Sequence, residues 1–231
     1  FIMIINNNDL NVLEIFNNVS SKTIEKVIKN SDIRKYKSSE VIFEDKEEVF
    51  TVYFVLQGIV SLYKINECGQ KKVIFMLGKG KIINEVIIQD LPSSINCEVF
   101  EESVILGINR DKLLELMQED FELCRNIIIS LSSKTRRLYR QLKNTPSSIK
   151  IEKRLAAKLY KLAKDYGVKC NEGIMIDMEI SITYLADLLG SQRETVSRAM
   201  KVLQKNELIS YKNKKIFISN FDKITLFFKT S

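Results

Sequence analysis

The chain of 231 residues has no histidine, no tryptophan and only two prolines. Histidine is the commonest general base and metal ligand and the usual haem ligand, so its absence argues against most acid–base enzymes, haem proteins and zinc sites. Carboxylate-based catalysis is the enzymatic chemistry that the composition still allows. The sequence also lacks any apolar run approaching the roughly 20 residues that span a bilayer.

Closely spaced cysteines are absent as well. Cys68, Cys97, Cys124 and Cys170 form no Cys-x-x-Cys pair, and no cysteine precedes Cys68. Closed zinc sites, disulfide frameworks and iron–sulfur clusters need thiols at shorter spacings. We therefore expect reduced thiols and no metal, haem or iron–sulfur cofactor. A thiol-based redox response at Cys97 or Cys124 remains the alternative to inert buried side chains.

What the chain does contain is typical of a globular protein with two modest cores, since 45% of its residues are hydrophobic and 28% are charged. Residues 1–5 are too few and too uncharged for a secretory signal, and asparagines follow them. We expect a cytoplasmic protein that has no membrane partner.

Charge is distributed unevenly along the chain. Residues 1–130 contain 15 Lys and Arg against 20 Asp and Glu, a balance of −5. Residues 131–231 contain 21 against 9, a balance of +12, and the whole chain carries +7. A basic C-terminal part indicates a polyanionic partner. Nucleic acid fits better than anionic lipid, because no basic amphipathic helix with exposed aromatic residues is evident.

Short apolar runs separated by turn residues fill residues 33–108 and predict β-strands. The runs are IRKYK, VIFE, TVYFVLQ, IVSLYKI, KKVIFML, KIIN, NCEVF and SVILGI. Gly58, Gly69 and Gly80 recur eleven residues apart, once in each strand-turn unit. This spacing is typical of an all-β barrel or a double-sheet roll. Upstream, residues 9–30 are expected to form two short helices with a break near Ser20.

A helical region follows the strands, with a short helix expected over 110–119 and a longer one over 120–143. In the longer helix a 4-3-4-3-4 spacing forms a heptad seam, which favours self-association. The seam consists of Cys124, Ile128, Leu131, Thr135, Leu138 and Leu142. The alternative is packing on the helix's own β-domain. Additional apolar residues at Phe121, Ile127 and Ile129 suggest that the helix does both.

The segment Asn144-Thr145-Pro146-Ser147-Ser148 is the best linker in the chain. A basic helix is expected beyond it over 149–166, and a short strand near 174–178. The predicted regions are a β-domain over 1–119, a dimerisation helix and hinge over 120–145 and a C-terminal domain over 146–231.

Residues 181–203 contain the most informative motif, two short helices joined by a glycine turn. Ser181 can cap the first helix, and Gly190 stands where a tight turn needs positive φ. Apolar residues at helical spacing can share one core. They are Leu185, Leu189, Val196, Met200 and Leu203.

The second helix of this motif then exposes a polar tip formed by Arg193, Glu194, Ser197 and Arg198. Long, forked and charged side chains are suited to base edges in a DNA major groove. The alternative is a helical hairpin whose charged side only meets solvent. Two short β runs after the motif surround Lys212-Asn213-Lys214 and predict a hairpin wing with a basic tip.

The chain resembles the Crp/Fnr superfamily of bacterial transcription regulators over nearly its whole length. The most specific stretch runs from Gly190 to Arg198, with its RETVSR core, and continues into KVLQKNELIS. The second is the glycine-punctuated YFVLQGIVSLYKINECGQKKVIFMLGKG. The resemblance implies an α+β fold: an N-terminal β-roll (jelly-roll) sensor domain, a long dimerisation helix and a C-terminal winged helix-turn-helix domain.

The resemblance also implies DNA contacts and no enzymatic activity. Arg193, Glu194 and Arg198 match base-reading positions of the family, and Ser197 matches a serine that some branches use. Contacts to phosphate are expected from Ser191, Gln192, Thr195, Lys201, Lys212 and Lys214. The expected partner is a palindromic double-stranded DNA operator, bound by a homodimer, with G·C pairs in half-sites resembling TGTGA or TTGA. RNA polymerase and a small-molecule effector are the further partners considered.

The effector region departs from the pattern of cyclic-AMP-binding members. Those members have a Gly-Glu-Leu segment whose glutamate holds the ribose, followed by Arg-Ser or Arg-Thr whose arginine holds the phosphate. Here the segment is Ile83-Asn84-Glu85-Val86, and no Lys or Arg lies between Glu85 and Cys97. A buried phosphate would lack a partner, which argues against cyclic AMP. The candidate pocket residues are Asn84, Glu85, Ser93, Ser94 and Cys97.

A different class of function stays open as the alternative: a ligand-binding or enzymatic β-domain whose winged helix contacts protein rather than DNA. An exposed pair of carboxylates in the β-domain would be its hallmark, and Glu85 stands largely alone there.

Overall fold

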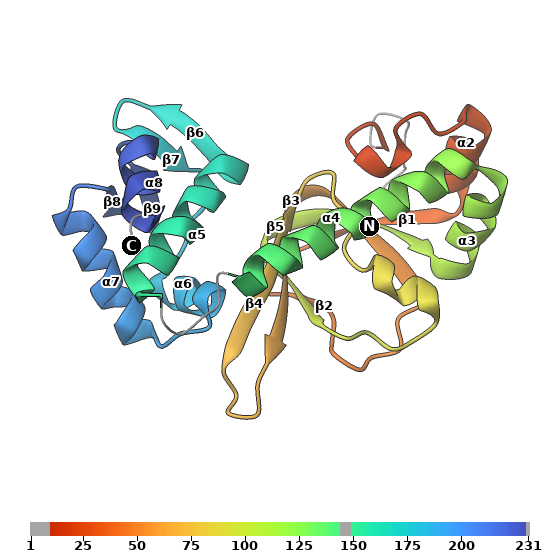
Figure 1. The fold of residues 1–231 in the computed structure, drawn as a ribbon. Coiled ribbons are helices and arrows are strands. Elements are labelled where there is room, and N and C mark those ends of the chain that lie inside the picture. The colour runs from red at the N-terminus through yellow and green to blue at the C-terminus, as the bar shows by residue number, and fades with distance from the viewer. Residues whose placement is uncertain (1–9, 144–148, 230–231) are drawn as a thin grey trace. The chain divides into compact units, whose positions relative to one another are not determined.

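The computed structural model describes residues 10–143 and 149–229, and the described chain forms two compact units (Figure 1). Most of the chain before Arg140 builds the first unit, and Arg140 and the residues after it belong to the second. The predicted linker, Asn144–Ser148, lies outside the described residues, and the predicted domain boundaries stay a prediction. No helix in the described ranges is both long and apolar enough to cross a membrane.

The first unit combines β-strands with helices. Its strands are β1 (Ser31–Tyr36), β2 (Val41–Phe43), β3 (Thr51–Ile65), β4 (Lys71–Gly78) and β5 (Asn96–Asn109). Its helices are η1 (Glu14–Phe16), α2 (Ser21–Lys29), η2 (Glu85–Gln89), α3 (Arg110–Glu119) and most of α4 (Phe121–Lys143), whose residues from Arg140 onward belong to the second unit. The helices η1 and η2 are short 3-10 helices. This order confirms the predicted β-roll followed by a long helix.

The sheet of the first unit has the strand order β1-β5-β3-β4, and β2 also pairs with β5. The eight predicted runs form fewer strands, because TVYFVLQ and IVSLYKI merge into β3, and NCEVF and SVILGI merge into β5. The register of β3 against β5 shifts around Gly58, whose φ is +84°. A Cβ on Gly58 would lie 2.3 Å from the Glu102 carbonyl oxygen. Gly58 therefore marks a bulge within one strand rather than a turn between two.

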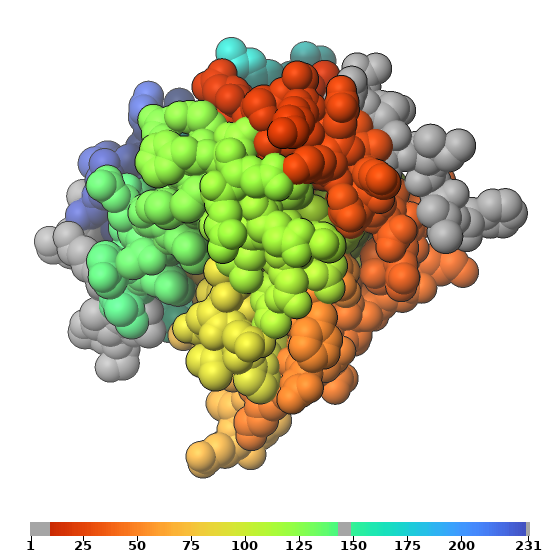
Figure 2. Space-filling model, turned by 90° about the vertical axis from the view of Figure 1, so that its right-hand side faces the viewer, coloured from red at the N-terminus to blue at the C-terminus, as the bar shows by residue number. Residues whose placement is uncertain are grey.

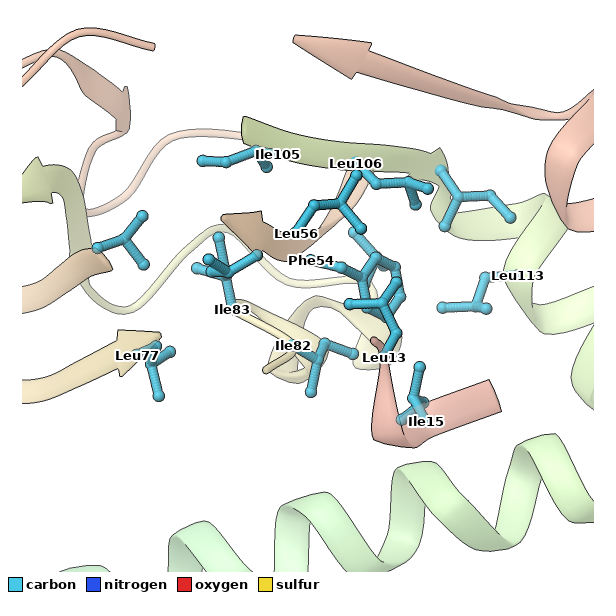
Figure 3. Close-up of a cluster of buried hydrophobic side chains, with 14 of the residues drawn as sticks. Leu13, Ile15, Phe54, Leu56, Leu77, Ile82, Ile83, Ile105, Leu106 and Leu113 are labelled. Carbon is cyan, nitrogen blue, oxygen red and sulfur yellow. The ribbon is translucent and has the colours of Figure 1, made fainter. Parts of the chain in front are cut away.

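The predicted strand KIIN is wrong, because this segment makes only one isolated bridge, between Ile82 and Phe54. The segment instead contributes apolar side chains to the core of the first unit. Figure 3 shows Ile82 there with Phe54, Leu13 and Leu113. These three residues come from three other parts of the chain. All four are at most 3% exposed, so the core joins the sheet, the N-terminal segment and α3.

The N-terminal segment is fastened to the beginning of α4. The backbone N–H of Ser20 donates to Asp120 Oδ2 at 3.0 Å. The side-chain amide of Asn126 donates to the carbonyls of Ile15 and Asn17, both at 2.9 Å. Figure 2 shows this segment (red) against the helical region that contains α3 and α4 (green). The predicted break near Ser20 is confirmed, and after the helical residue Leu10 the first predicted helix is present only as the single turn η1.

The second unit packs helices beside a four-stranded antiparallel sheet. Its helices are α5 (Ile151–Tyr166), α6 (Ile182–Leu189), α7 (Arg193–Lys205) and α8 (Phe221–Lys229). Its strands are β6 (Gly167–Cys170), β7 (Gly173–Ile176), β8 (Ile209–Lys212) and β9 (Lys215–Ile218), in the order β6-β7-β9-β8. The predicted winged helix-turn-helix domain is confirmed.

Two elements of the second unit were not predicted from the sequence. The strand β6 has all four residues exposed. The helix α8 packs on α5, where the Tyr160 ring lies 5.0 Å from the Phe221 ring and 5.6 Å from the Phe228 ring between centroids. The α8 segment carries apolar residues at helical spacing, so its periodicity could have revealed it.

Candidate nucleic-acid interface and effector region

The turn between α6 and α7 has the geometry that its sequence predicts. The Ser181 hydroxyl caps α6 by accepting a hydrogen bond from the backbone N–H three residues later, at 3.0 Å. Gly190 has φ +58° and ψ +51°, the left-handed conformation that glycine adopts without a Cβ clash. The N–H groups of Gly190 and Ser191 donate to the carbonyls of Asp187 and Ala186, at 3.3 and 3.0 Å. These bonds end α6 and begin a short link to α7.

The helix α7 has a buried side and an exposed side. The predicted core of the motif is confirmed, because all its members are at most 5% exposed: Leu185, Leu189, Val196, Met200 and Leu203. The other side carries exposed Arg193, Glu194 and Arg198 and half-buried Ser197. These four residues lie in the first two turns of α7 and form one polar surface, here called the α7 surface.

Of the residues predicted to contact phosphate, Ser191, Gln192 and Thr195 lie at the N-terminal end of α7, and Lys201 lies one turn beyond Arg198. Gln192 and Lys201 are exposed, and Ser191 and Thr195 are half-buried. Gln192 directly precedes the first turn of α7. The backbone N–H groups of a first helical turn lack acceptors within the helix, and the helix dipole there favours an anion.

The wing is the hairpin of β8 and β9. Asn213 and Lys214 at its tip have φ of +49° and +61°, as both central residues of a type I′ turn do. Lys212 pairs with Glu172 of the β6–β7 hairpin at 3.2 Å. Lys214 is exposed and forms no ion pair with any residue that the structure describes. The wing tip therefore presents a cation at the end of a short, tightly turned hairpin.

The predicted effector region centres on Glu85, the first residue of η2, whose side chain is completely buried. One carboxylate oxygen accepts a hydrogen bond from Ser130 Oγ at 3.0 Å. The other forms an ion pair with Lys134 Nζ. Ser130 and Lys134 lie one turn apart on α4, so the long helix supplies both partners. No Lys or Arg lies between Glu85 and Cys97 in the sequence, and the structure brings a cation to Glu85 from 49 residues downstream.

Lys134 is surrounded by acceptors. Besides Glu85, its Nζ donates to the backbone carbonyls of Ile82 and Ile83, at 2.9 and 3.0 Å. Its side chain is 18% exposed. Burial lowers the pKa of the Lys134 ammonium, and the charge of Glu85 acts in the opposite direction. An ammonium has three donors, and these three acceptors use all of them.

Two of the other predicted pocket residues, Asn84 and Ser93, form hydrogen bonds with the backbone. The buried Asn84 amide accepts from the Tyr53 N–H and donates to the Thr51 carbonyl, both at 2.9 Å. The buried Ser93 hydroxyl donates to the carbonyl two residues later at 2.8 Å. Ser94 is exposed. The polar side-chain groups of Asn84 and Ser93 are therefore bonded to the backbone of the chain itself.

Cys97 is fully buried on β5. Burial raises the pKa of its thiol far above the ordinary range, with a smaller contribution from Glu98. Because the thiolate is the reactive form, this thiol is inert at neutral pH. Cys68 and Cys170 are exposed, and Cys124 is half-buried. Within residues 10–143 and 149–229, no three His, Cys, Asp or Glu side chains are grouped as a metal site would need.

The helix α4 has one side buried in the first unit and an apolar side that the described chain leaves exposed. Leu123 and Ile127 are at most 1% exposed, and Leu131 packs partly against the same core. Large exposed side chains recur along the helix, and these residues are here called the α4 face: Phe121, Ile128, Ile129, Leu138, Tyr139 and Leu142. Of the predicted seam, Cys124 and Leu131 are half-buried, and Thr135 is exposed.

Two family models match the chain and together cover more than half of it. The model of the cyclic nucleotide-binding domain matches residues 33–120, and the model of the Crp-like helix-turn-helix domain matches residues 153–225. The first match contains β1 to α3, and the second contains α6, α7 and the wing.

Named relatives match this chain over most of its length. The global nitrogen regulator of Nostoc sp. is 25% identical over 189 residues, which are 80% of this chain and 84% of that protein. The cAMP-activated global transcriptional regulator CRP of Salmonella typhimurium is 26% identical over 212 residues, which are 85% and 93% of the two chains.

Solved structures agree at the level of the fold. FixK2 from Bradyrhizobium japonicum superposes with a TM-score of 0.77 at 18% sequence identity, over 87% of this chain and 98% of that one. With its β-roll, long helix and winged helix-turn-helix in the order of these relatives, the chain belongs to the Crp/Fnr superfamily of DNA-binding transcription regulators.

Proposed function

We propose that a homodimer of this chain binds a two-fold symmetric DNA operator and that the α7 surface reads each half-site. The observation that carries the proposal is the placement of Arg193, Glu194, Ser197 and Arg198 on the exposed side of a helix whose other side is buried. An arginine fork pairs with guanine O6 and N7, and a glutamate accepts from cytosine N4. The proposed half-sites therefore contain G·C pairs and resemble TGTGA or TTGA.

The phosphate contacts in this proposal position α7 without specifying sequence. They come from Ser191, Gln192 and Thr195 at the α7 N-terminus, from Lys201 further along α7, and from Lys212 and Lys214 in the wing. Lys212 must then share its charge between Glu172 and the DNA backbone. RNA polymerase is the proposed protein partner of the bound dimer.

A duplex with inverted TGTGA or TTGA half-sites is expected to bind about 10³-fold more tightly than a scrambled duplex at physiological salt, because specific complexes of this kind gain at least that ratio. Fluorescence anisotropy titrations of both duplexes measure the ratio, and repeating them across salt concentrations gives the electrostatic part of binding. Cyclic AMP is expected to leave both affinities unchanged.

Equal affinity for the two duplexes would contradict the proposed base reading. Absence of binding even at low salt would instead favour the alternative in which the winged helix contacts protein.

We further propose that the α4 face joins two protomers. Regulators of this family act as dimers, and heptad-spaced apolar residues favour helix pairing. The seam residues Ile128, Leu138 and Leu142 are 54%, 40% and 72% exposed. Covering them with a second copy removes apolar surface from water, worth about 25 cal/mol for each Å².

Replacing Leu138 and Leu142 with glutamate is expected to raise the dimer dissociation constant by about 100-fold or more, because the contact would bury unpaired charge. Sedimentation equilibrium measures this change. Ser133→Glu is the control, since it adds a charge at an exposed α4 position on the side opposite the seam. A double variant that stays as dimeric as the control would rule out this contact.

The proposed signal is not cyclic AMP. The resemblance assigns Glu85 to the ribose of a cyclic nucleotide, but here its two oxygens are held by Ser130 and Lys134. A nucleotide would have to break a buried ion pair, which is strongly unfavourable. The signal in this proposal is another small molecule or a redox change at the half-buried Cys124, since Cys97 is fully buried on β5. With Glu85 engaged in this way, the proposal gives the β-roll no catalytic role.

A further inference from the structure

Arg154 lies outside the helix-turn-helix motif but contacts it. It lies in the first turn of α5, and its side chain reaches the end of α6. Arg154 Nη2 donates a hydrogen bond to the Leu189 carbonyl at 2.6 Å. The side chain is half-buried, so this bond is partly shielded from water.

The carbonyl that Arg154 holds is one that α6 itself cannot satisfy. The last four carbonyls of a helix have no partner within the helix. In α6, two of them are bonded by the turn, since Ala186 accepts from Ser191, and Asp187 accepts from Gly190. Leu189 is the last residue of α6, and its carbonyl is taken by Arg154. A guanidinium at this end also complements the negative pole of the helix dipole.

The part of α5 that carries Arg154 is firmly packed. The residues next to Arg154 on α5, Leu155 and Ala156, are 0% exposed and belong to the packed interior of the second unit. The backbone of Arg154 cannot shift without disturbing that packing. The hydrogen bond from the Arg154 guanidinium therefore holds the end of α6 against the rigidly packed helix α5.

Leu189, whose carbonyl accepts the hydrogen bond from Arg154, lies close in sequence to the α7 surface. Only Gly190, Ser191 and Gln192 separate Leu189 from Arg193. Gly190 is left-handed and Gln192 is extended, with φ −75° and ψ +144°. A turn this short transmits a displacement of the α6 end directly to the first residue of α7.

We infer that Arg154 is a positioning residue for DNA reading: it holds the end of α6 so that Arg193 and its neighbours meet the half-site at the productive angle. The inference rests on the proposed base reading by α7. Arg154 acts through the Leu189 carbonyl and makes no contact with DNA in this account. Base readout depends on sub-ångström placement of donors, whereas phosphate attraction tolerates displacement. Losing Arg154 should therefore weaken specific binding more than non-specific binding.

Arg154→Gln is expected to weaken binding to the palindromic duplex about 10-fold, or about 1.4 kcal/mol, and to change binding to the scrambled duplex by less than about 2-fold. Arg154→Lys, which keeps the charge but loses the planar fork, is expected to fall between wild type and Arg154→Gln. Lys164→Gln is the control, because Lys164 is exposed on the same helix and its change removes the same charge.

Three results would overturn the inference. A direct phosphate contact would lower both affinities equally and reduce the salt slope by about one. A purely structural role would lower the unfolding temperature and leave the ratio of specific to scrambled affinity unchanged. An Arg154→Gln variant with the affinities of the Lys164→Gln control would show no role at all. If wild type itself fails to prefer the palindrome, the proposed base reading fails first, and the two failures are distinguishable.

Discussion

Replacing Lys134 with methionine is expected to lower the free energy of unfolding of the first unit by about 3–5 kcal/mol, the usual loss when one partner of a buried ion pair is removed. The Glu85 carboxylate would keep only the Ser130 hydroxyl as a side-chain partner, and the carbonyls of Ile82 and Ile83 would lose their donor. Urea denaturation followed by circular dichroism measures the loss.

The double variant Glu85→Gln with Lys134→Met separates the ion pair from other effects of the substitution. It removes both charges, so most of the lost stability should return, because neutral side chains of similar volume often replace a buried pair without loss. Lys79→Met is the matched control, since Lys79 is exposed in the same unit. If Lys134→Met loses less than about 1 kcal/mol, as an exposed pair would, the buried pair contributes little and α4 is held by its apolar contacts alone.

Replacing Arg193 or Arg198 with alanine is expected to weaken binding to the palindromic duplex by about 1–3 kcal/mol each, because each change removes a bidentate contact with guanine. Binding to a scrambled duplex should change much less, since it depends on charge and not on base edges. Competition titrations with duplexes altered one base pair at a time identify the base pair that each side chain reads.

Glu194→Gln tests base reading more directly in the same assay, because it is expected to change base preference without lowering the overall affinity. An amide can both donate and accept, so preference at one base pair should change while the overall affinity is retained. Lys205→Ala is the matched control, because Lys205 is exposed in the last turn of α7, away from the α7 surface. If the arginine variants lose affinity equally for all duplexes, these side chains contact phosphate and another element reads the bases.

Much of the second unit could be predicted because its signals are local. The cap at Ser181, the left-handed Gly190 and the apolar spacing of α6 and α7 each lie within a few residues of the structure they determine. Hydrophobic periodicity and capping are properties of neighbouring residues, so a single sequence contains them.

The first unit was harder to predict because its decisive contacts join distant residues. Gly58 was expected to end a strand, but the partner strand β5 accommodates it as a bulge. The cation beside Glu85 comes from Lys134, on a helix whose heptad pattern gives no sign of it. Asn84 replaces the small glycine of the resembling segment, and its amide joins the backbones at Thr51 and Tyr53. Such pairings depend on tertiary contacts that periodicity does not encode.

The tip of the wing places a charged residue, Lys214, at a position where glycine would be more stable. A lysine in the left-handed region costs roughly 1–2 kcal/mol relative to glycine, which would adopt the same φ without strain. Lys214 nevertheless occupies the second central position of the turn, with φ +61°. The pairing of β8 with β9 holds this backbone in place despite the strain, so the charge starts from a defined point rather than from a loose loop. The hairpin is therefore less stable than a glycine-tipped turn of the same length, but it presents a positive charge at a defined position, which the glycine turn could not do.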